Sequence, residues 1–169
     1  MFDIQLPYVE VDPNSKQACP ETAGKRILLI DGNPIARASM LKYLKAWNFD
    51  CAGATSGTEA KAMLLAMRQS RVTPDCILLD SSVQDTDCRE MVAGIRALPG
   101  MAEVPLLVFT SVHQFEVSGE LSQLHSTECL EKPVRPSRLK VKLSEHRNDL
   151  DAADDELRRN VAVAQKLAS

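Results

Sequence analysis

The stretch Cys76–Asp80 reads Cys-Ile-Leu-Leu-Asp, four apolar residues followed at once by a carboxylate. Asp31, Thr110 and Lys132 each follow an apolar run in the same way. Short continuous apolar runs are typical of strands that are buried on both faces of a parallel sheet. Ligands of such a sheet bind outside the carboxyl ends of its strands, so we expect these four side chains to gather at one edge. Two carboxylates, a hydroxyl and an ammonium group suit phosphoryl chemistry assisted by a divalent metal.

The composition describes a single globular domain. The chain has 169 residues, is 44% hydrophobic and carries a formal net charge of −3, which suffices for one buried core. We expect no nucleic-acid partner, because binding a duplex needs a basic surface. No apolar run reaches about 18 residues and no signal peptide precedes the domain, so we expect no membrane contact and a cytoplasmic location.

The five cysteines form no C-x-x-C pair. An odd number without that spacing argues against both a disulfide framework and a zinc cage. Three of them, Cys51, Cys76 and Cys129, fall in expected strands. We therefore expect these three to be small buried residues.

Strand and helix patterns alternate from Lys25 onward. The expected strands cover residues 27–30, 51–54, 76–79, 105–109 and 129–130. Asn33 and Pro34 suit the cap and first residue of a first helix, and Ser56 with Glu59 suits a capping box for a second. Further helices are expected at about 87–97, 114–124 and 137–146. Since each parallel crossover needs its helix, the pattern predicts an α/β fold with a doubly wound, five-stranded parallel sheet.

Four blocks of the sequence together resemble a response-regulator receiver domain. In chain order they are Ile27–Asp31, Ile77–Asp80, Leu107–Thr110 and Leu130–Pro133. The separations resemble those of the family as well, with 30 residues from Asp80 to Thr110 and 22 from Thr110 to Lys132. The resemblance covers residues 25–146. It implies a flavodoxin-like sheet with the strand order 2-1-3-4-5.

The resemblance also implies a role for each site residue. Asp80 would be the nucleophile that takes a phosphoryl group from a phosphohistidine. Thr110 and Lys132 would complete the catalytic set by contacting the phosphoryl oxygens, and the peptide bond after Lys132 would be cis. Mg²⁺ would offset the charge that develops on the transferred group. Its expected protein ligands are Asp31, Asp80 and Ser82.

The sequence departs from the family pattern at three places. Gly32 stands where a second acid normally touches the metal, so the Mg²⁺ affinity should be weakened. Cys129 stands where an aromatic switch residue is common, and a thiol cannot act as a rotating ring does. Gln84 and Cys88 replace the usual Pro and Gly of the loop after Asp80, which should reshape that loop.

Two functions therefore remain open. In the first, the domain is a phosphorelay receiver that accepts a phosphoryl group on Asp80 and regulates attached kinase or output domains. In the second, it is a degenerate pseudo-receiver that controls a kinase by docking or by binding a ligand without being phosphorylated. A cyclic dinucleotide is one such ligand, on the basic surface formed by Arg135, Arg138, Lys140 and Lys142. Whether the chain is an enzyme stays open, since alone it would at most catalyse its own phosphorylation.

The two ends of the chain suggest a wider context. Residues 1–24 resemble the end of a histidine kinase domain followed by a linker. Residues 147–169 place acidic before basic side chains with a partial heptad repeat, which predicts a helical linker to a following domain. The resemblance thus implies an inner receiver of a hybrid sensor histidine kinase. Its partners would be a kinase core or phosphotransfer domain, a neighbouring receiver, and a second copy through the C-terminal helix.

Overall fold

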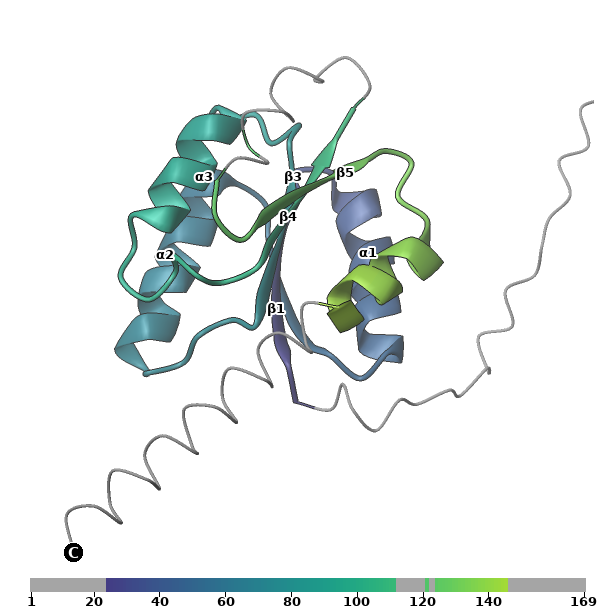
Figure 1. Ribbon diagram of the computed structural model, residues 1–169, viewed down its shortest axis with the longest axis horizontal. Coiled ribbons are helices and arrows are strands. Elements are labelled where there is room, and N and C mark those ends of the chain that lie inside the picture. The colour runs from purple at the N-terminus through teal and green to yellow at the C-terminus, as the bar shows by residue number, and fades with distance from the viewer. Residues whose placement is uncertain (1–23, 112–120, 122–123, 146–169) are drawn as a thin grey trace, which may run out of the picture.

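The computed structural model describes residues 24–111, 121 and 124–145 (Figure 1). Three predictions therefore lie almost wholly outside the described residues. They are the kinase-derived segment 1–24, the helix at 114–124 and the helical linker 147–169.

Five parallel strands form one sheet in the order β2-β1-β3-β4-β5. The strands are β1 (Arg26–Ile30), β2 (Asp50–Ala54), β3 (Cys76–Asp80), β4 (Leu106–Thr110) and β5 (Thr127–Glu131). The predicted fold class and strand order are confirmed. In register, Ile30 lies opposite Leu79, and Asp80 lies opposite Phe109. The carboxyl ends of the three central strands are therefore nearly level, which brings the residues that follow them to one edge.

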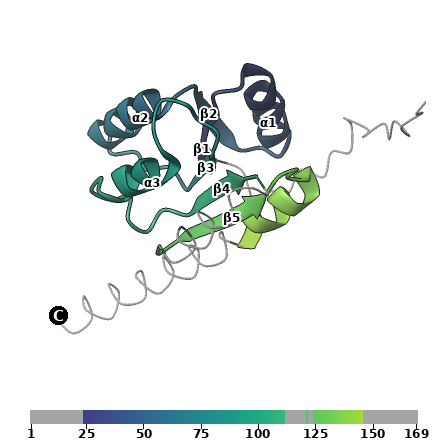
Figure 2. The ribbon, with the colours of Figure 1, turned by 90° about the horizontal axis from the view of Figure 1, so that it is seen from above.

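Helices cover both faces of the sheet. They are α1 (Pro34–Ala46), α2 (Gly57–Gln69), α3 (Cys88–Arg96) and the helical residues 136–145. Figures 1 and 2 show α2 and α3 on one face, with α1 and the 136–145 helix on the other. The predicted starts of α1 and α2 are confirmed, although the Glu59 side chain of the expected capping box accepts the Thr55 N–H rather than that of Ser56. The Asn33 side chain accepts hydrogen bonds from the first turn of α1, which begins at Pro34, and the Ser56 side chain caps α2. No helix of the described part is long and apolar enough to cross a membrane.

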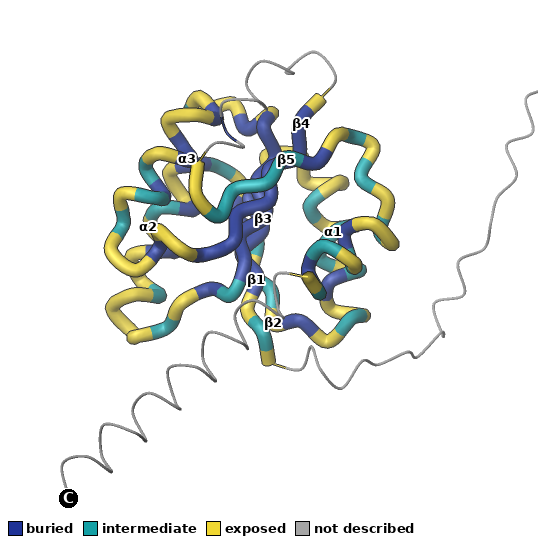
Figure 3. Tube along the Cα trace, in the orientation of Figure 1, coloured by how far each residue is buried: buried dark blue, intermediate teal, exposed yellow. Residues whose placement is uncertain are grey.

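The core consists of two apolar clusters, one on each face of the sheet. Alternate residues of one strand enter different clusters: Leu28 and Ile30 pack toward α2 and α3, whereas Ile27 and Leu29 pack toward α1. Figure 3 shows the buried strands at the centre of the molecule. This two-sided burial explains why the central strands are continuous apolar runs rather than alternating ones.

The cysteine prediction was right for only one of the three strand cysteines. Cys76, in the central strand β3, is buried. Cys51 and Cys129 are half-buried, because both lie in edge strands, which are covered less completely than the centre of the sheet. Within the described ranges, no cysteine forms a disulfide.

Candidate functional site

Buried polar side chains concentrate at the carboxyl edge of the sheet. Asp31, Asp80 and Thr110 follow or end β1, β3 and β4, and they are only 5%, 6% and 3% exposed. Ser81, beside Asp80, is buried too. Acidic residues are almost never fully buried unless they are paired, so this concentration of polar groups requires specific partners.

Asp80 has its partners on two sides. The ammonium of Lys132 contacts both carboxylate oxygens at 2.7 Å. The backbone N–H and the hydroxyl of Ser82 donate to Oδ1 at 2.8 and 2.6 Å. Burial by itself raises the pKa of Asp80, but the hydrogen bonds from Lys132 and Ser82 outweigh it and hold the pKa below its usual value. Asp80 is therefore an ionised carboxylate at neutral pH.

Asp31 is held mainly through its backbone. Its N–H donates to the Ala54 carbonyl at 3.1 Å, and its own carbonyl accepts a hydrogen bond of 2.6 Å from the Arg37 guanidinium. Its carboxylate accepts the Asn33 N–H at 2.8 Å. Burial raises the pKa of Asp31, and the negative charge of Asp80 raises it further. The two carboxylates thus repel each other, and a cation between them would relieve that repulsion.

Thr110 and Lys132 are linked through the backbone. The N–H of Lys132 donates to the Thr110 carbonyl at 2.8 Å, which continues the pairing of β4 and β5 to their carboxyl ends. The bond between Lys132 and Pro133 is cis, as predicted. The Asp80 side chain thus contacts the side chains of Ser82 and Lys132 directly. Thr110 ends the adjacent strand β4, and Asp31 lies within electrostatic reach of Asp80.

The donor atoms fit Mg²⁺. This ion takes oxygen ligands and keeps several waters, so one or two carboxylates are enough, and Asp31 with Asp80 supplies two. Within residues 24–111, 121 and 124–145, no group of three or more His, Cys, Asp or Glu side chains could hold a metal. Ser82 lies at the site, with its N–H and hydroxyl both donating to Asp80.

Gly32 has room for a Cβ atom. A Cβ atom built at this position would meet only the Thr55 carbonyl oxygen, at an ordinary contact distance of 3.5 Å. Lack of space for a Cβ atom therefore does not explain why the acid of the family pattern is absent at position 32.

Two contacts near the site had no signal in the sequence. Arg37 reaches back from α1 to the Asp31 carbonyl. Its side chain passes close to Gly53, where a Cβ atom would lie 3.1 Å from the Arg37 Cδ atom. Asp85, in the loop after Asp80, accepts hydrogen bonds from Gly57 and Thr58 at the start of α2. Asp31 and Arg37 are six residues apart, whereas Asp85 and Gly57 are 28 residues apart and meet only in the folded chain.

Comparisons with known proteins agree with the geometry. A family model for the response regulator receiver domain matches residues 27–144. None of the curated proteins matches the chain.

Three solved structures illustrate the likeness. A receiver domain protein of Clostridium thermocellum is 16% identical with a TM-score of 0.67, covering 76% of this chain and 98% of its own. The receiver domain of a sensor histidine kinase from Pseudomonas aeruginosa PAO1, with a magnesium ion coordinated in its active site cleft, is 23% identical (TM-score 0.63; 75% and 99% covered). The chemotaxis response regulator CheY4 of Vibrio cholerae is 22% identical (TM-score 0.63; 73% and 99% covered). At these identities the likeness concerns the fold.

Proposed function

The chain belongs to the response regulator receiver family, and from that membership we propose that it is a phosphoacceptor of a phosphorelay. Asp80 takes a phosphoryl group from a phosphohistidine on a kinase core or phosphotransfer domain. The phosphorylated domain then regulates kinase or output domains attached to it. We place it within a hybrid sensor histidine kinase as an inner receiver, bounded by a kinase segment at 1–24 and by a helical linker at 147–169, in the cytoplasm.

The observation that carries this proposal is the environment of Asp80. A nucleophilic carboxylate must be ionised, and the contacts of Lys132 and Ser82 lower the pKa of Asp80 despite its burial. In the transfer, a carboxylate oxygen forms a bond to phosphorus while the bond between phosphorus and the histidine nitrogen breaks. The nitrogen keeps the bonding electron pair, and Asp80 becomes an acyl phosphate.

The neighbours of Asp80 have complementary roles in this proposal. Lys132 already contacts both carboxylate oxygens, so its charge lies where the phosphoryl oxygens arrive. Thr110 offers a hydroxyl to the same group from the end of β4. Asp31 and Asp80 would hold Mg²⁺, which when bound neutralises charge on the transferred group. Because Lys132 and Thr110 are joined by a backbone hydrogen bond, a shift at the phosphoryl group would reach β5.

Phosphorylation of the full chain tests the proposal. The chain is incubated with acetyl phosphate and Mg²⁺, and intact-mass spectrometry follows the addition of one phosphoryl group. We expect one group on the wild-type chain and none on Asp80→Asn, whose amide is not nucleophilic. The proposal fails if the wild-type chain remains unmodified under conditions that label an ordinary receiver.

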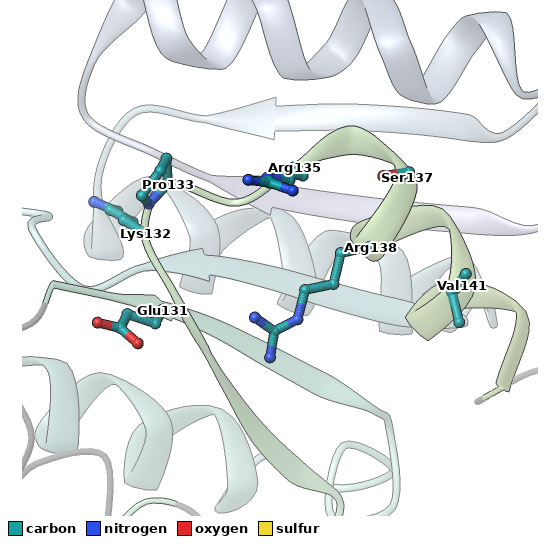
Figure 4. A pocket seen from close by; sticks show the side chains of 7 residues that line it. All are labelled: Glu131, Lys132, Pro133, Arg135, Ser137, Arg138 and Val141. Carbon is teal, nitrogen blue, oxygen red and sulfur yellow. The ribbon is translucent and has the colours of Figure 1, made fainter.

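A groove beside the site favours a second candidate function. It measures about 720 Å³, within the usual range for ligand sites. Its lining residues are Glu131, Lys132, Pro133, Arg135, Ser137, Arg138 and Val141 (Figure 4). Arg135 and Arg138 belong to the predicted basic surface, whereas Lys142 is engaged by Glu128 and Glu145 at 2.9 Å.

In this alternative the domain is a pseudo-receiver whose groove binds an anionic ligand such as a cyclic dinucleotide. The guanidinium groups of Arg135 and Arg138, which both line the groove, suit two phosphates. Calorimetry with a cyclic dinucleotide would then show binding that Arg138→Ala weakens and Asp80→Asn preserves. Binding absent from the wild-type chain excludes this alternative.

A further inference from the structure

The loop between β3 and α3, residues 81–87, is fastened at its far end to α2. The Asp85 carboxylate accepts the Gly57 N–H at 2.8 Å and the Thr58 N–H at 3.0 Å. It also accepts the Thr58 hydroxyl at 3.1 Å. The first N–H groups of a helix have no partner within the helix, and the positive end of the helix dipole favours a carboxylate there. The same hydrogen bonds lower the pKa of Asp85.

Close packing accompanies these hydrogen bonds. A Cβ atom at Gly57 would lie 2.9 Å from the Thr86 hydroxyl oxygen and 3.0 Å from the Cε atom of Met91. The Thr86 distance is shorter than the contacts that a real Cβ makes, so a larger residue at position 57 would displace the Thr86 side chain of the loop; the Met91 atom belongs to α3 and is also very close. The loop thus contacts α2 through a polar group and through direct packing.

The near end of the loop is fastened to Asp80. Ser82 donates both its N–H and its hydroxyl to the Asp80 carboxylate, and the Val83 N–H donates to the Asp80 carbonyl at 3.3 Å. Ser82 and Asp85 are separated by only two residues. One of these is Gln84, which lacks the fixed backbone angle of the proline that the family usually has there. The order of this loop must therefore come from its contacts.

We propose that Asp85 is a positioning residue of the phosphoacceptor site. By holding the loop on the first turn of α2, it keeps Ser82 in place against the Asp80 carboxylate, and it couples the position of α2 to events at Asp80. The role as part of a phosphoacceptor rests on the function proposed above. The mechanical part, that Asp85 orders Ser82, does not.

Three variants of the full chain separate this role from general stability. Asp85→Ala removes all three hydrogen bonds to α2. Asp87→Ala is the matched control in the same loop, because it removes the cap of α3, where Asp87 accepts the Arg89 N–H at 2.8 Å, and leaves α2 alone. Glu59→Ala is the control on α2, because Glu59 accepts the Thr55 N–H at 2.7 Å without touching the loop.

Two measurements are made on each variant. Hydrogen exchange followed by NMR reports the protection of the Ser82 amide, and mass spectrometry reports the rate of phosphorylation by acetyl phosphate with Mg²⁺. We expect Asp85→Ala to lose Ser82 protection and to react about tenfold more slowly, as metal and active sites do when a supporting group is removed. Asp85→Asn keeps one acceptor oxygen and should fall between Asp85→Ala and the wild type. Both control variants should retain Ser82 protection and react at the wild-type rate, because neither removes a contact of Ser82 or Asp85.

The outcomes distinguish the two proposals. If Asp85→Ala leaves Ser82 as well protected as the controls do, the positioning role is refuted whatever the rate shows. If Ser82 protection is lost only in Asp85→Ala but the wild-type chain takes no phosphoryl group, Asp85 orders the loop and the phosphoacceptor function fails.

Discussion

Replacing Gly32 with aspartate should restore metal affinity at the carboxyl edge of the sheet. The backbone accepts the change, because a Cβ at this position meets only the Thr55 carbonyl oxygen at 3.5 Å. The new carboxylate would follow directly on Asp31, which already lies within electrostatic reach of Asp80. Three acids in place of two give Mg²⁺ an additional direct ligand.

The expected gain follows from the charges. One added supporting group changes metal affinity by about tenfold, which corresponds to about 1.4 kcal/mol. Without metal, the added charge should destabilise the folded chain. Burial and the charge of Asp80 already raise the pKa of Asp31, so a third carboxylate adds repulsion and lowers the free energy of unfolding. Saturating Mg²⁺ should reverse the loss, since a ligand of the folded state stabilises it by about 2.7 kcal/mol at 100 times its dissociation constant.

Calorimetric titration with MgCl₂ and thermal unfolding in EDTA or Mg²⁺ measure both effects. Gly32→Asn is the matched control, because it adds the same shape without the charge. We expect Gly32→Asp alone to bind Mg²⁺ about tenfold more tightly and to melt below the wild type only in EDTA. Equal affinity in the aspartate and asparagine variants would show that residue 32 is not at the metal site and that the alignment of the first strand with the receiver family is wrong.

Three further predictions concern stability and reactivity. The pKa of Asp31 is raised above 3.8 in the folded chain, so its ionisation lowers the free energy of unfolding as the pH rises above that value. Asp31→Asn should therefore unfold at a higher urea concentration than the wild type at pH 7 and lose this advantage below pH 3.8. The same variant should not bind Mg²⁺. Arg96→Met removes hydrogen bonds to the carbonyls of Met101, Val104 and Ser126 and should cost about 1 to 3 kcal/mol in denaturant unfolding, because buried acceptors lose their donor. The exposed control Arg68→Met should cost less than about 0.5 kcal/mol, and equal losses would refute the bridging role of Arg96. Burial raises the pKa of Cys76 to about 12 and that of Cys88 to about 11. Iodoacetamide, which reacts with the thiolate, should therefore label both cysteines at pH 8 only after the chain unfolds in urea. Equal labelling rates in buffer and in urea would contradict this prediction.

The central strands could be predicted from the sequence because both of their faces are buried. β1, β3 and β4 are continuous apolar runs, and their predicted bounds agree with the structure to within one residue. The edge strand β5 was predicted at 129–130 but extends from Thr127 to Glu131. Only Leu130 of this strand is buried, so its length depends on backbone pairing with β4, which an apolar pattern does not record.

The candidate site was predictable where its residues end strands. Asp80 and Lys132 are 52 residues apart, but their positions after apolar runs, together with the family resemblance, were enough to place them at one edge. The supporting contacts had no such signal. Asp85 and Gly57 are 28 residues apart, and a carboxylate that binds backbone N–H groups leaves no periodicity in either segment. The sequence indicated an altered loop from the absent Pro and Gly, without indicating what holds it.

The two departures near Asp80 therefore differ in their consequences for function. In the loop, the proline absent at Gln84 is offset by the Asp85 contacts with Gly57 and Thr58, so order there comes from hydrogen bonds. At Gly32 no such replacement exists, because the described residues supply no third acid for a metal group. A count of missing motif residues would weigh both departures equally. The contacts show instead that the loop has substitute hydrogen bonds, whereas the metal site has no substitute acid among the described residues. Weak metal binding, rather than a disordered phosphoacceptor loop, is where this receiver should differ from its relatives, and its phosphorylation should accordingly need more Mg²⁺ than theirs.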